Sequence, residues 1–553
     1  MDTSNAGELK KTPSEKEDVK SDPPSQLPTP PTRSAFKSIL LVVTMTLGMM
    51  VNTAGSTSIT MTLPTIGKEF HLQENELQWL VSAYPLSSGC LLLVFGRVAD
   101  LYGRKKVFLC GSLFLAIFTL ACSFQHDVIS LDIIRGIQGI GSAAIVPASL
   151  GILADAFPPS RARSLAFATF SAGAPLGGVV GSVVGGILTQ YTAKTWRAPF
   201  YLMTGLTVLC FVGSLISIDP DVPSCDPDKR IDWLGAFSVT AGLVLIVFVL
   251  SQGELAPRKW ATPYIIALII LGVLLLVLFV IWQQYLEKVQ DDPNAVHSAL
   301  TPPPLIKPSL WKRGEGRFAA MMIIGFVNWA AFLAWIFWVQ LYFQNYLQLS
   351  VIQSVVRFLP MVVSGLLCNT FVGIMAARVP VIYLTAIGTG ATAVACLLFA
   401  LINPGASYWA FTFPASVISV MGADFVFSTG TLFIAKVSMP HEQSVAGALF
   451  LTMNQLGTAL GVATTTVVFN RVDLHRHGRD GIVSYKAAQW TAFAFGVLGT
   501  LLSILFFRGV GPAGFREPID KPETLNGDEE RTMTLDSNQD IKVRSKEVPN
   551  LNR

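Results

Sequence analysis

The sequence predicts an all-α protein that crosses a membrane fourteen times. Composition is the first reason: 51% of the 553 residues are hydrophobic and only 14% are charged, whereas about a quarter of the residues are charged in a soluble domain. Length is the second, because apolar runs of about 20 residues, enough for a helix to span a bilayer, recur almost from end to end. The third is that Lys and Arg concentrate in alternate loops.

The predicted spans have approximate boundaries, because a hydropathy pattern places helix ends only to within a few residues. They lie near residues 37–62, 77–95, 107–124, 131–156, 164–189, 199–218, 233–251, 263–283, 318–343, 351–376, 381–402, 408–436, 443–470 and 487–507. An even number of spans puts both termini on one side of the membrane. The tails and the loops on that side hold most of the Lys and Arg, so both termini are expected in the cytosol.

Polar and proline-rich stretches divide the chain further. The expected parts are a disordered cytosolic tail at 1–36, a six-helix bundle at 37–218, a linker at 219–317, a second six-helix bundle at 318–507 and a disordered cytosolic tail at 508–553. The linker contains the two spans 233–251 and 263–283, followed by a cytosolic loop. Neither span carries an ionisable residue, so both are expected to face lipid at the periphery.

The most specific motif is the predicted cytosolic loop Gly96–Lys106 after the second span. Gly96 and Gly103 favour a tight turn between closely packed helices. Asp100 is expected to cap a neighbouring helix N-terminus, while Arg104 bridges to an acid. We take Asp155, at the cytosolic end of the fourth span, as the candidate acid. The alternative is a merely basic inner loop, which leaves the aspartate and the paired glycines unexplained.

This loop resembles the GxxxDxxGRK signature of the major facilitator superfamily, with Gly96, Asp100, Gly103, Arg104 and Lys105 at the defining positions. The resemblance implies two six-helix bundles around a midplane substrate site, with the loop as a cytosolic gate. It also implies movement of a solute by alternating access, in which the two bundles rock about the central cavity.

The fourth span carries Arg135 and Gln138 in a segment similar to the superfamily pattern RxxQGxG. An arginine inside a span is costly unless it faces protein or water, so a coupling role is expected. The alternative is that Arg135 snorkels to the outer headgroups, assisted by Asp132.

Glycine recurs at every fourth residue of the fifth span, a spacing that lets two helices approach closely. The residues are Gly173, Gly177, Gly181 and Gly185. The stripe resembles the GPxxGG signature of drug-exporting antiporters, except that Ser182 stands where the pattern has proline. Tight packing alone explains the stripe whatever the direction of transport.

Asp424 is the candidate proton carrier, because it is a lone carboxyl near the centre of the twelfth predicted span. Such a group can change its charge as water reaches it from one side and then the other. The segment around Asp424 and the turn Pro440–Gln443 resemble those of fungal aminotriazole-resistance and boron-efflux transporters. The alternative is a hydrogen-bonded strut. Arg357 in the tenth span is either the counter-ion of Asp424 or a contact for an anionic substrate.

Drug/proton antiporters with fourteen helices often have an acid in the first span before a Leu-Pro turn. Here the residues before Leu63-Pro64 include no carboxyl group, which moves the expected coupling role to Asp424.

Polar and aromatic residues within the spans are the candidates for a substrate cavity. They are Asn52, Gln138, Trp329, Phe332, Trp335 and Asn454. An aromatic wall in the ninth span suits planar or amphiphilic cargo. Contact of these aromatic rings with lipid explains the same stripe, and each polar residue taken alone is more often a bridge between helices.

Several function classes are disfavoured by the sequence. No phosphate-binding GxxxxGK[ST] motif, membrane-embedded histidine cluster or nucleophile–base pair is present, so an enzyme, a metal site and a resident cofactor are not expected. The near balance of basic and acidic residues gives no nucleic-acid footprint.

The preferred interpretation is a monomeric, multi-pass transporter of the plasma membrane that exchanges protons for a small organic toxicant or metabolite leaving the cell. The alternatives are a facilitator of a small solute such as ammonium, borate or a weak acid, and a nutrient sensor that keeps the transporter fold.

Overall fold

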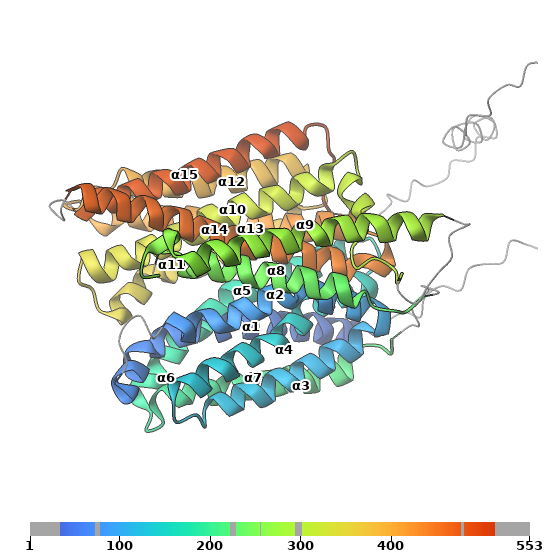
Figure 1. Ribbon diagram of the computed structural model, residues 1–553, viewed down its shortest axis with the longest axis horizontal. Coiled ribbons are helices and arrows are strands. Elements are labelled where there is room, and N and C mark those ends of the chain that lie inside the picture. Colours follow the sequence, from blue (N-terminus) through green and yellow to red (C-terminus); the bar gives the residue numbers. More distant parts are fainter. Residues whose placement is uncertain are drawn as a thin grey trace, which may run out of the picture.

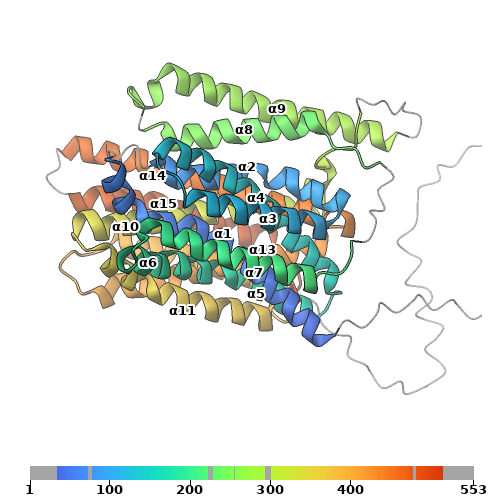
Figure 2. The same cartoon turned by 90° about the horizontal axis from the view of Figure 1, so that it is seen from below.

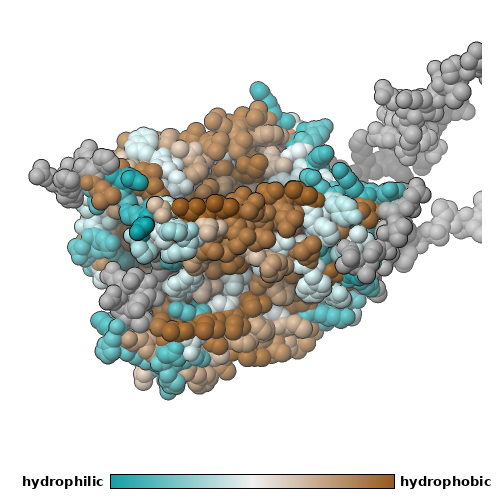
Figure 3. All heavy atoms as spheres, in the orientation of Figure 1, coloured by the Kyte–Doolittle hydropathy of each residue, from teal (hydrophilic) through white to brown (hydrophobic). Residues whose placement is uncertain are grey.

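The computed structural model describes residues 34–71, 78–221, 228–254, 256–292, 301–476 and 481–514. Within these residues fourteen helices are long and apolar enough to cross a membrane, as the sequence predicted. In Figure 1 they run roughly side by side along the long axis of the molecule. An apolar band covers the middle of the surface in Figure 3, with hydrophilic residues toward both ends of the helices.

The helices are α1 (Ala35–Phe70), α2 (Gln78–Tyr102), α3 (Arg104–Cys122), α4 (Val128–Ala156), α5 (Arg161–Val179), α6 (Gly185–Tyr191), α7 (Ala198–Ser217), α8 (Trp233–Gln252), α9 (Pro263–Asp291), α10 (Arg317–Leu341), α11 (Val351–Met375), α12 (Val381–Ala400), α13 (Tyr408–Val437), α14 (Gln443–Arg476) and α15 (Gly481–Phe506). The π-helical segment Val180–Val184 joins α5 to α6, so Arg161–Tyr191 is one span. The single span predicted near 164–189 is therefore correct, with a π-bulge inside its glycine-rich part.

The two six-helix bundles of the fold are visible in the packing. In the first half, α2 and α3 pack on α4, while α1 packs on α5 and α7. In the second half, α12 packs on α13 and α15, and α10 packs on α14 and α15. The two halves meet mainly where α5 packs on α11 and where α2 packs on α14. We call the end of the molecule that contains Gly96–Lys106 the motif end and the opposite end the far end.

The glycines of the span Arg161–Tyr191 determine how closely α1 approaches. A methyl group added at Gly173, Gly177, Gly181 or Gly185 would contact α1 residues between Thr46 and Ser58. At Gly177 the contacts are the backbone oxygen of Met50 and the side chain of Thr53. Gly178 and Gly186, by contrast, have open space around the corresponding position.

The linker helices lie outside the two bundles, with α8 between the bundles and α9 (Figure 2). α9 presents most of its apolar side chains outward, as expected of a lipid-facing helix. α8 differs from the expectation, because it packs on both α2 and α14 and covers the line where the two halves meet. The ring of Phe248 in α8 stacks on Trp79 of α2 with centroids 5.5 Å apart.

At the far end, the loop after α8 is attached to the second half through Glu254. Its carboxylate accepts hydrogen bonds from Asn470 Nδ2 at 2.9 Å and from Trp260 Nε1 at 2.7 Å, and Lys259 lies 3.3 Å away. Partial burial acts to raise the pKa of Glu254, but these hydrogen bonds and the Lys259 charge outweigh it and lower the pKa. The linker hairpin therefore contacts both halves.

The contrast between neighbouring glycines gives a direct test of the α1–α5 contact. Gly177→Ala is expected to lower the free energy of unfolding by about 1–3 kcal/mol, because the methyl group is forced against the α1 backbone. Gly178→Ala is the matched control and is expected to be neutral or stabilising by up to about 1 kcal/mol, since alanine favours helix at both positions. Thermal unfolding in detergent compares the two. Equal stability of the two variants would contradict the contact.

Candidate functional site

The motif loop forms a compact turn between α2 and α3. Gly103 has a φ of 115°, which a side chain at this position would strain. Arg104, the first residue of α3, folds back so that its Nη2 lies 2.9 Å from Asp100 Oδ1, and its Nη1 donates to the carbonyl of Gly151 in α4 at 3.0 Å. The turn thus places one carboxylate and one guanidinium at the motif end of α2.

Asp100 joins the first half of the molecule to the second. Its carboxylate accepts hydrogen bonds from the backbone N–H groups of Ser444 at 3.3 Å and Val445 at 3.0 Å, at the beginning of α14. Arg104 Nη2 also donates to the carbonyl of Pro440 at 2.5 Å. Gly96 lets α2 and α14 approach, since a methyl group there would contact Ala448. These contacts form what we call the latch: Asp100 and Arg104 of the first half bound to residues 440–445 of the second.

Other residues near the latch contribute unequally. Asp155 Oδ2 lies 3.4 Å from Arg104 Nη1, but its side chain is 62% exposed, so this ion pair is worth little. Lys105 contacts the point where the first half continues into the linker, because its backbone N–H donates to Asp221 and its ammonium to the carbonyl of Ile218. Arg163 of α5 donates to the carbonyl of Ala435 in α13 at 3.1 Å, which adds a further hydrogen bond between the halves.

Sequence reasoning missed Arg163 and did not identify the helix that Asp100 caps. Arg163 does not stand out in the sequence, because Arg161 is a second basic residue in the same first turn of the span and nothing distinguishes the two.

Arg135 is fully buried in the first half and is held by neutral groups. Its Nη1 donates to the carbonyl of Gly55 at 3.0 Å and to Gln138 Oε1 at 3.1 Å, and its Nε donates to the carbonyl of Leu80 at 3.3 Å. The guanidinium carbon lies 4.9 Å from the centre of the Tyr84 ring. The side chain of Arg135 therefore does not snorkel to the outer headgroups. Its Nη2 has no hydrogen-bond partner among the described residues.

A polar network continues from Tyr84 toward α1 and α4. The Tyr84 hydroxyl donates to Asn52 Oδ1 at 3.2 Å, and the Ser142 hydroxyl donates to the same oxygen. Gln138 Nε2 donates to Thr119 Oγ1 at 2.7 Å. Asn52 and Gln138 are thus both hydrogen-bonded between helices of the first half, and Tyr84 is a member that the sequence analysis did not single out.

Asp424 lies in α13 beside the surface where the two halves meet. Its side chain is 7% exposed, and Oδ2 has no hydrogen-bond partner among the described residues. A methyl group at Gly365 of α11 would lie 2.9 Å from Asp424 Oδ2 and 3.1 Å from Pro175 Cβ of α5. The carboxyl group is thus separated from the first half by little more than a glycine.

Asn369 and Cys368 of α11 are neighbours of the Asp424 carboxyl group. Asn369 is itself fixed, because its Oδ1 accepts from Ser428 at 2.6 Å and its Nδ2 donates to the carbonyl of Gly365 at 2.9 Å.

Arg357 is placed away from Asp424. It lies six residues after the far-end start of α11, whereas Asp424 lies sixteen residues after the far-end start of α13. The difference of ten residues corresponds to about 15 Å of helix rise. The guanidinium of Arg357 instead lies over the rings of Phe343 and Tyr408, at 5.4 and 5.5 Å from their centres.

The aromatic stripe of α10 is divided between two environments. Trp335 is 0% exposed and packs edge-on against Phe399 inside the second half, so it does not share the environment of Trp329 and Phe332. Those two residues are partly exposed, and the Trp329 ring lies 5.6 Å from that of Phe427 in α13. A step of three residues turns through about 300°, short of a full turn, so the two steps from Trp329 to Trp335 leave these rings about 120° apart around the helix axis.

Asn454 of α14 is 3% exposed, and neither its Oδ1 nor its Nδ2 has a hydrogen-bond partner among the described residues. It faces α10, since a methyl group at Gly325 would lie 2.6 Å from its Oδ1. Gly325 lies one helical turn before Trp329. A buried carboxamide with both ends unpaired is costly, and such a group is suited to bind a polar ligand.

Two helical bundles, membrane-length spans and a charged contact that joins the bundles at one end are the features of a polytopic membrane transporter. The chain belongs to the Major Facilitator Superfamily, whose family model matches residues 45–230 and 222–462. This family consists of transporters, so the chain is not an enzyme, in agreement with its sequence.

The chain is similar in sequence to three fungal proteins. It is 26% identical to Efflux pump terJ of Aspergillus terreus, over 86% of this chain and 89% of the relative. It is 27% identical to the Low affinity ammonium transporter of Saccharomyces cerevisiae, over 80% and 83% of the two chains. Identity to the Aminotriazole resistance protein of the same yeast is 25%, over 85% and 84%. Among solved structures, the proton:xylose symporter XylE superposes with a TM-score of 0.61 at 14% identity, over 87% of this chain and 98% of that one.

The latch can be tested through amide exchange at the start of α14. Asp100→Asn removes the charge that binds the Ser444 and Val445 N–H groups, which we expect to accelerate exchange in residues 440–448 about tenfold or more. Asp155→Asn, which loses only an exposed contact, should change exchange by less than about threefold. Hydrogen–deuterium exchange mass spectrometry measures both variants in nanodiscs. Similar exchange in the Asp100 variant and the unmodified protein would contradict the latch.

Proposed function

We propose that this chain exports a small organic toxicant or metabolite from the cytosol in exchange for protons. The observation that carries the proposal is Asp424, a buried carboxyl group with one unpartnered oxygen, close to the contact between α11 and Pro175 of the first half. A carboxyl group at a moving boundary between two bundles can meet water from one side and then from the other. The similarity to Efflux pump terJ supports the direction of transport.

The cross-half hydrogen bonds described above, made by Asp100, Arg104 and Arg163, all lie at the motif end. We assign the motif end and both termini to the cytosol, from the distribution of Lys and Arg. The structure then corresponds to a state closed toward the cytosol. Breaking the latch and closing the far end would complete the cycle, with domains 37–218 and 318–507 rocking about the site.

The site residues have distinct proposed roles. Asp424 carries the proton, and Trp329, Phe332 and Asn454 contact the cargo. Arg135, held by Gln138, supplies a fixed positive group in the first half, and Asn52 belongs to the neighbouring network of Tyr84 and Ser142. Arg357 is assigned to the far-end part of the pathway rather than to pairing with Asp424.

The free energies are compatible with exchange. A proton contributes about 1.4 kcal/mol per pH unit and about 2.3 kcal/mol per 100 mV. A 100-fold cargo ratio requires about 2.7 kcal/mol, so one proton under a moderate gradient suffices. We further propose that the protein acts as a monomer in the plasma membrane.

The second candidate is a facilitator of ammonium or another small solute, favoured by the similarity to the Low affinity ammonium transporter. A facilitator needs no proton carrier, and Asp424 would then be a strut between α11 and α13.

Purified protein in liposomes separates the two candidates. Cargo is first identified by comparing the intracellular accumulation of toxic compounds in a deletion strain and its parent. For a proton exchanger, cargo leaving the liposome down an outward gradient should bring protons in and acidify the lumen, and a lumen more acidic than the outside should drive cargo uptake.

Asp424→Asn is expected to reduce pH-driven uptake at least tenfold and to leave cargo-for-cargo exchange measurable, because the neutral amide fills the same space but binds no exchangeable proton. Asp219→Asn, a loop residue paired with Lys37, is the control and should retain pH-driven uptake. Cargo flux that is indifferent to pH and unaltered by Asp424→Asn would favour the facilitator.

A further inference from the structure

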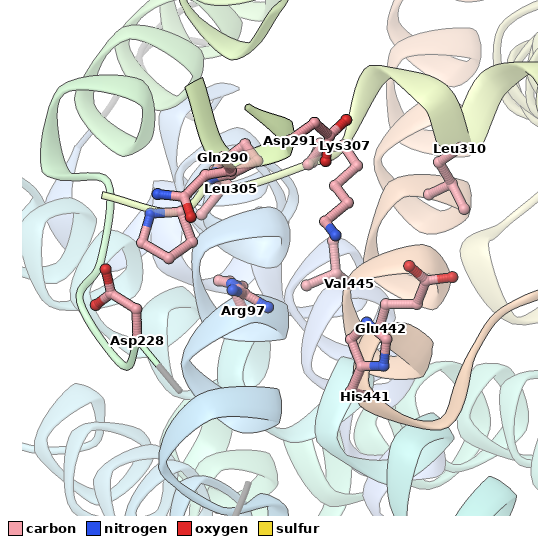
Figure 4. Close-up of a pocket in the computed structure, with 13 residues that line it drawn as sticks. Arg97, Asp228, Gln290, Asp291, Leu305, Lys307, Leu310, His441, Glu442 and Val445 are labelled. Carbon is pink, nitrogen blue, oxygen red and sulfur yellow. The ribbon is translucent and has the colours of Figure 1, made fainter. Parts of the chain in front are cut away.

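A small cavity lies at the motif end where the first half, the second half and the linker meet (Figure 4). Its volume is about 190 Å³. Arg97 of α2, Lys307 of the linker and His441 of the turn before α14 all line it. Ligand sites for drug-sized molecules are typically about 300–1,000 Å³. The cavity is therefore too small for such cargo and is sized for a compact polar group.

The linker forms one wall of the cavity through residues 301–310, which we call the roof segment. It is fixed along the motif end of α9, where the backbone N–H of Ile306 donates to Gln283 Oε1 and that of Ser309 to Glu287 Oε1, both at 3.1 Å. Leu305 and Leu310 are buried in the main apolar core. The roof segment is thus part of the folded protein, and the residues that it contributes to the cavity are held in position.

The acidic residues of the cavity are largely neutralised by arginines. Glu442 is paired with Arg313, and Asp228 Oδ2 lies 2.6 Å from Arg230 Nη2. Asp291 is the remaining carboxylate in the lining.

Three basic side chains reach the cavity from three separate parts of the chain. Arg97 is 8% exposed, and it lies at the centre of the view in Figure 4. Lys307 extends from the roof segment into the same space, and His441 lies across from it. Lys307 forms no ion pair within 4.0 Å with the residues that the structure describes. A guanidinium, an ammonium and an imidazole around one small space are suited to bind a phosphate group, with several charge-assisted hydrogen bonds.

We propose that this cavity binds a phosphate-bearing anion, and that the bound phosphate holds the motif end closed. Because the basic groups belong to α2, to the linker and to the turn before α14, one phosphate contacts both halves at once. It therefore acts beside the Asp100 latch, on the same pair of helices. The shared chemistry is a terminal phosphate group, supplied either by a soluble phosphorylated compound or by the headgroup of a lipid such as phosphatidic acid. The inference requires no particular cargo and no proton coupling.

The test uses full-length protein in nanodiscs of phosphatidylcholine, titrated with inorganic phosphate. We expect saturable binding by calorimetry, together with at least fivefold slower amide exchange in residues 440–448. Lys307→Gln should weaken binding at least tenfold, and His441→Gln should weaken it in the same direction. Lys312→Gln is the matched control, because Lys312 is an exposed lysine close to the roof segment that does not line the cavity.

A second arm replaces part of the phosphatidylcholine with phosphatidic acid. Slower exchange that requires phosphatidic acid and Lys307, with no response to inorganic phosphate, identifies a lipid headgroup as the occupant. A response to inorganic phosphate in neutral nanodiscs identifies a soluble one.

Three results would overturn the proposal. The first is that neither probe binds. The second is that Lys307→Gln and Lys312→Gln weaken binding equally, which indicates general surface charge. The third is that a bound probe leaves amide exchange in residues 440–448 unchanged. Thermal unfolding of each variant without ligand shows that loss of binding is not loss of fold.

Discussion

The contact between the Asp100 carboxylate and the beginning of α14 is the interaction that joins the two halves at the motif end. The carboxylate belongs to the first half, yet it accepts two backbone hydrogen bonds from the N-terminus of α14 in the second half. The N–H groups at a helix start have no partner within the helix, and the helix dipole favours a negative charge beside them. Arg104 holds the carboxylate in place and reaches Pro440 itself. The latch consists of a few polar contacts at the motif end, in addition to the packing of α5 on α11 and of α2 on α14.

Each half also has a buried ionisable group inside a span that forms no ion pair within 4.0 Å with the residues that the structure describes. In the first half this is Arg135, held by carbonyl groups, Gln138 and the Tyr84 ring. In the second half it is Asp424, which lies next to Gly365 and Pro175. Buried charges are expensive unless they are paired, and within a membrane they are found mainly where function requires them. The two groups differ in position, because Arg135 lies inside the first half whereas Asp424 lies beside the surface where the halves meet.

The linker does more than face lipid, because it contacts both halves of the molecule. α8 packs on α2 and α14, Glu254 binds Asn470 at the far end, and Arg313 binds Glu442 at the motif end. A hairpin attached to both bundles must deform or release one attachment when the bundles rock. The cavity under the roof segment lies at this junction, so an occupant there acts on the same motion as the latch.

The sequence by itself determined the class of fold, because span length and low charge density are local properties that a bilayer imposes on any chain. It also identified Asp100, Arg104, Arg135 and Asp424, since a charge in or beside an apolar run stands out without any structure. Only the tertiary structure decided which residues and helices these groups contact. Asp100 caps a helix more than 340 residues away in the sequence, α8 turns its featureless apolar surface to two helices, and Trp335 points into a bundle core while Trp329 does not. Hydropathy is the same for an apolar side chain in lipid and in a protein core, so only packing distinguishes the two.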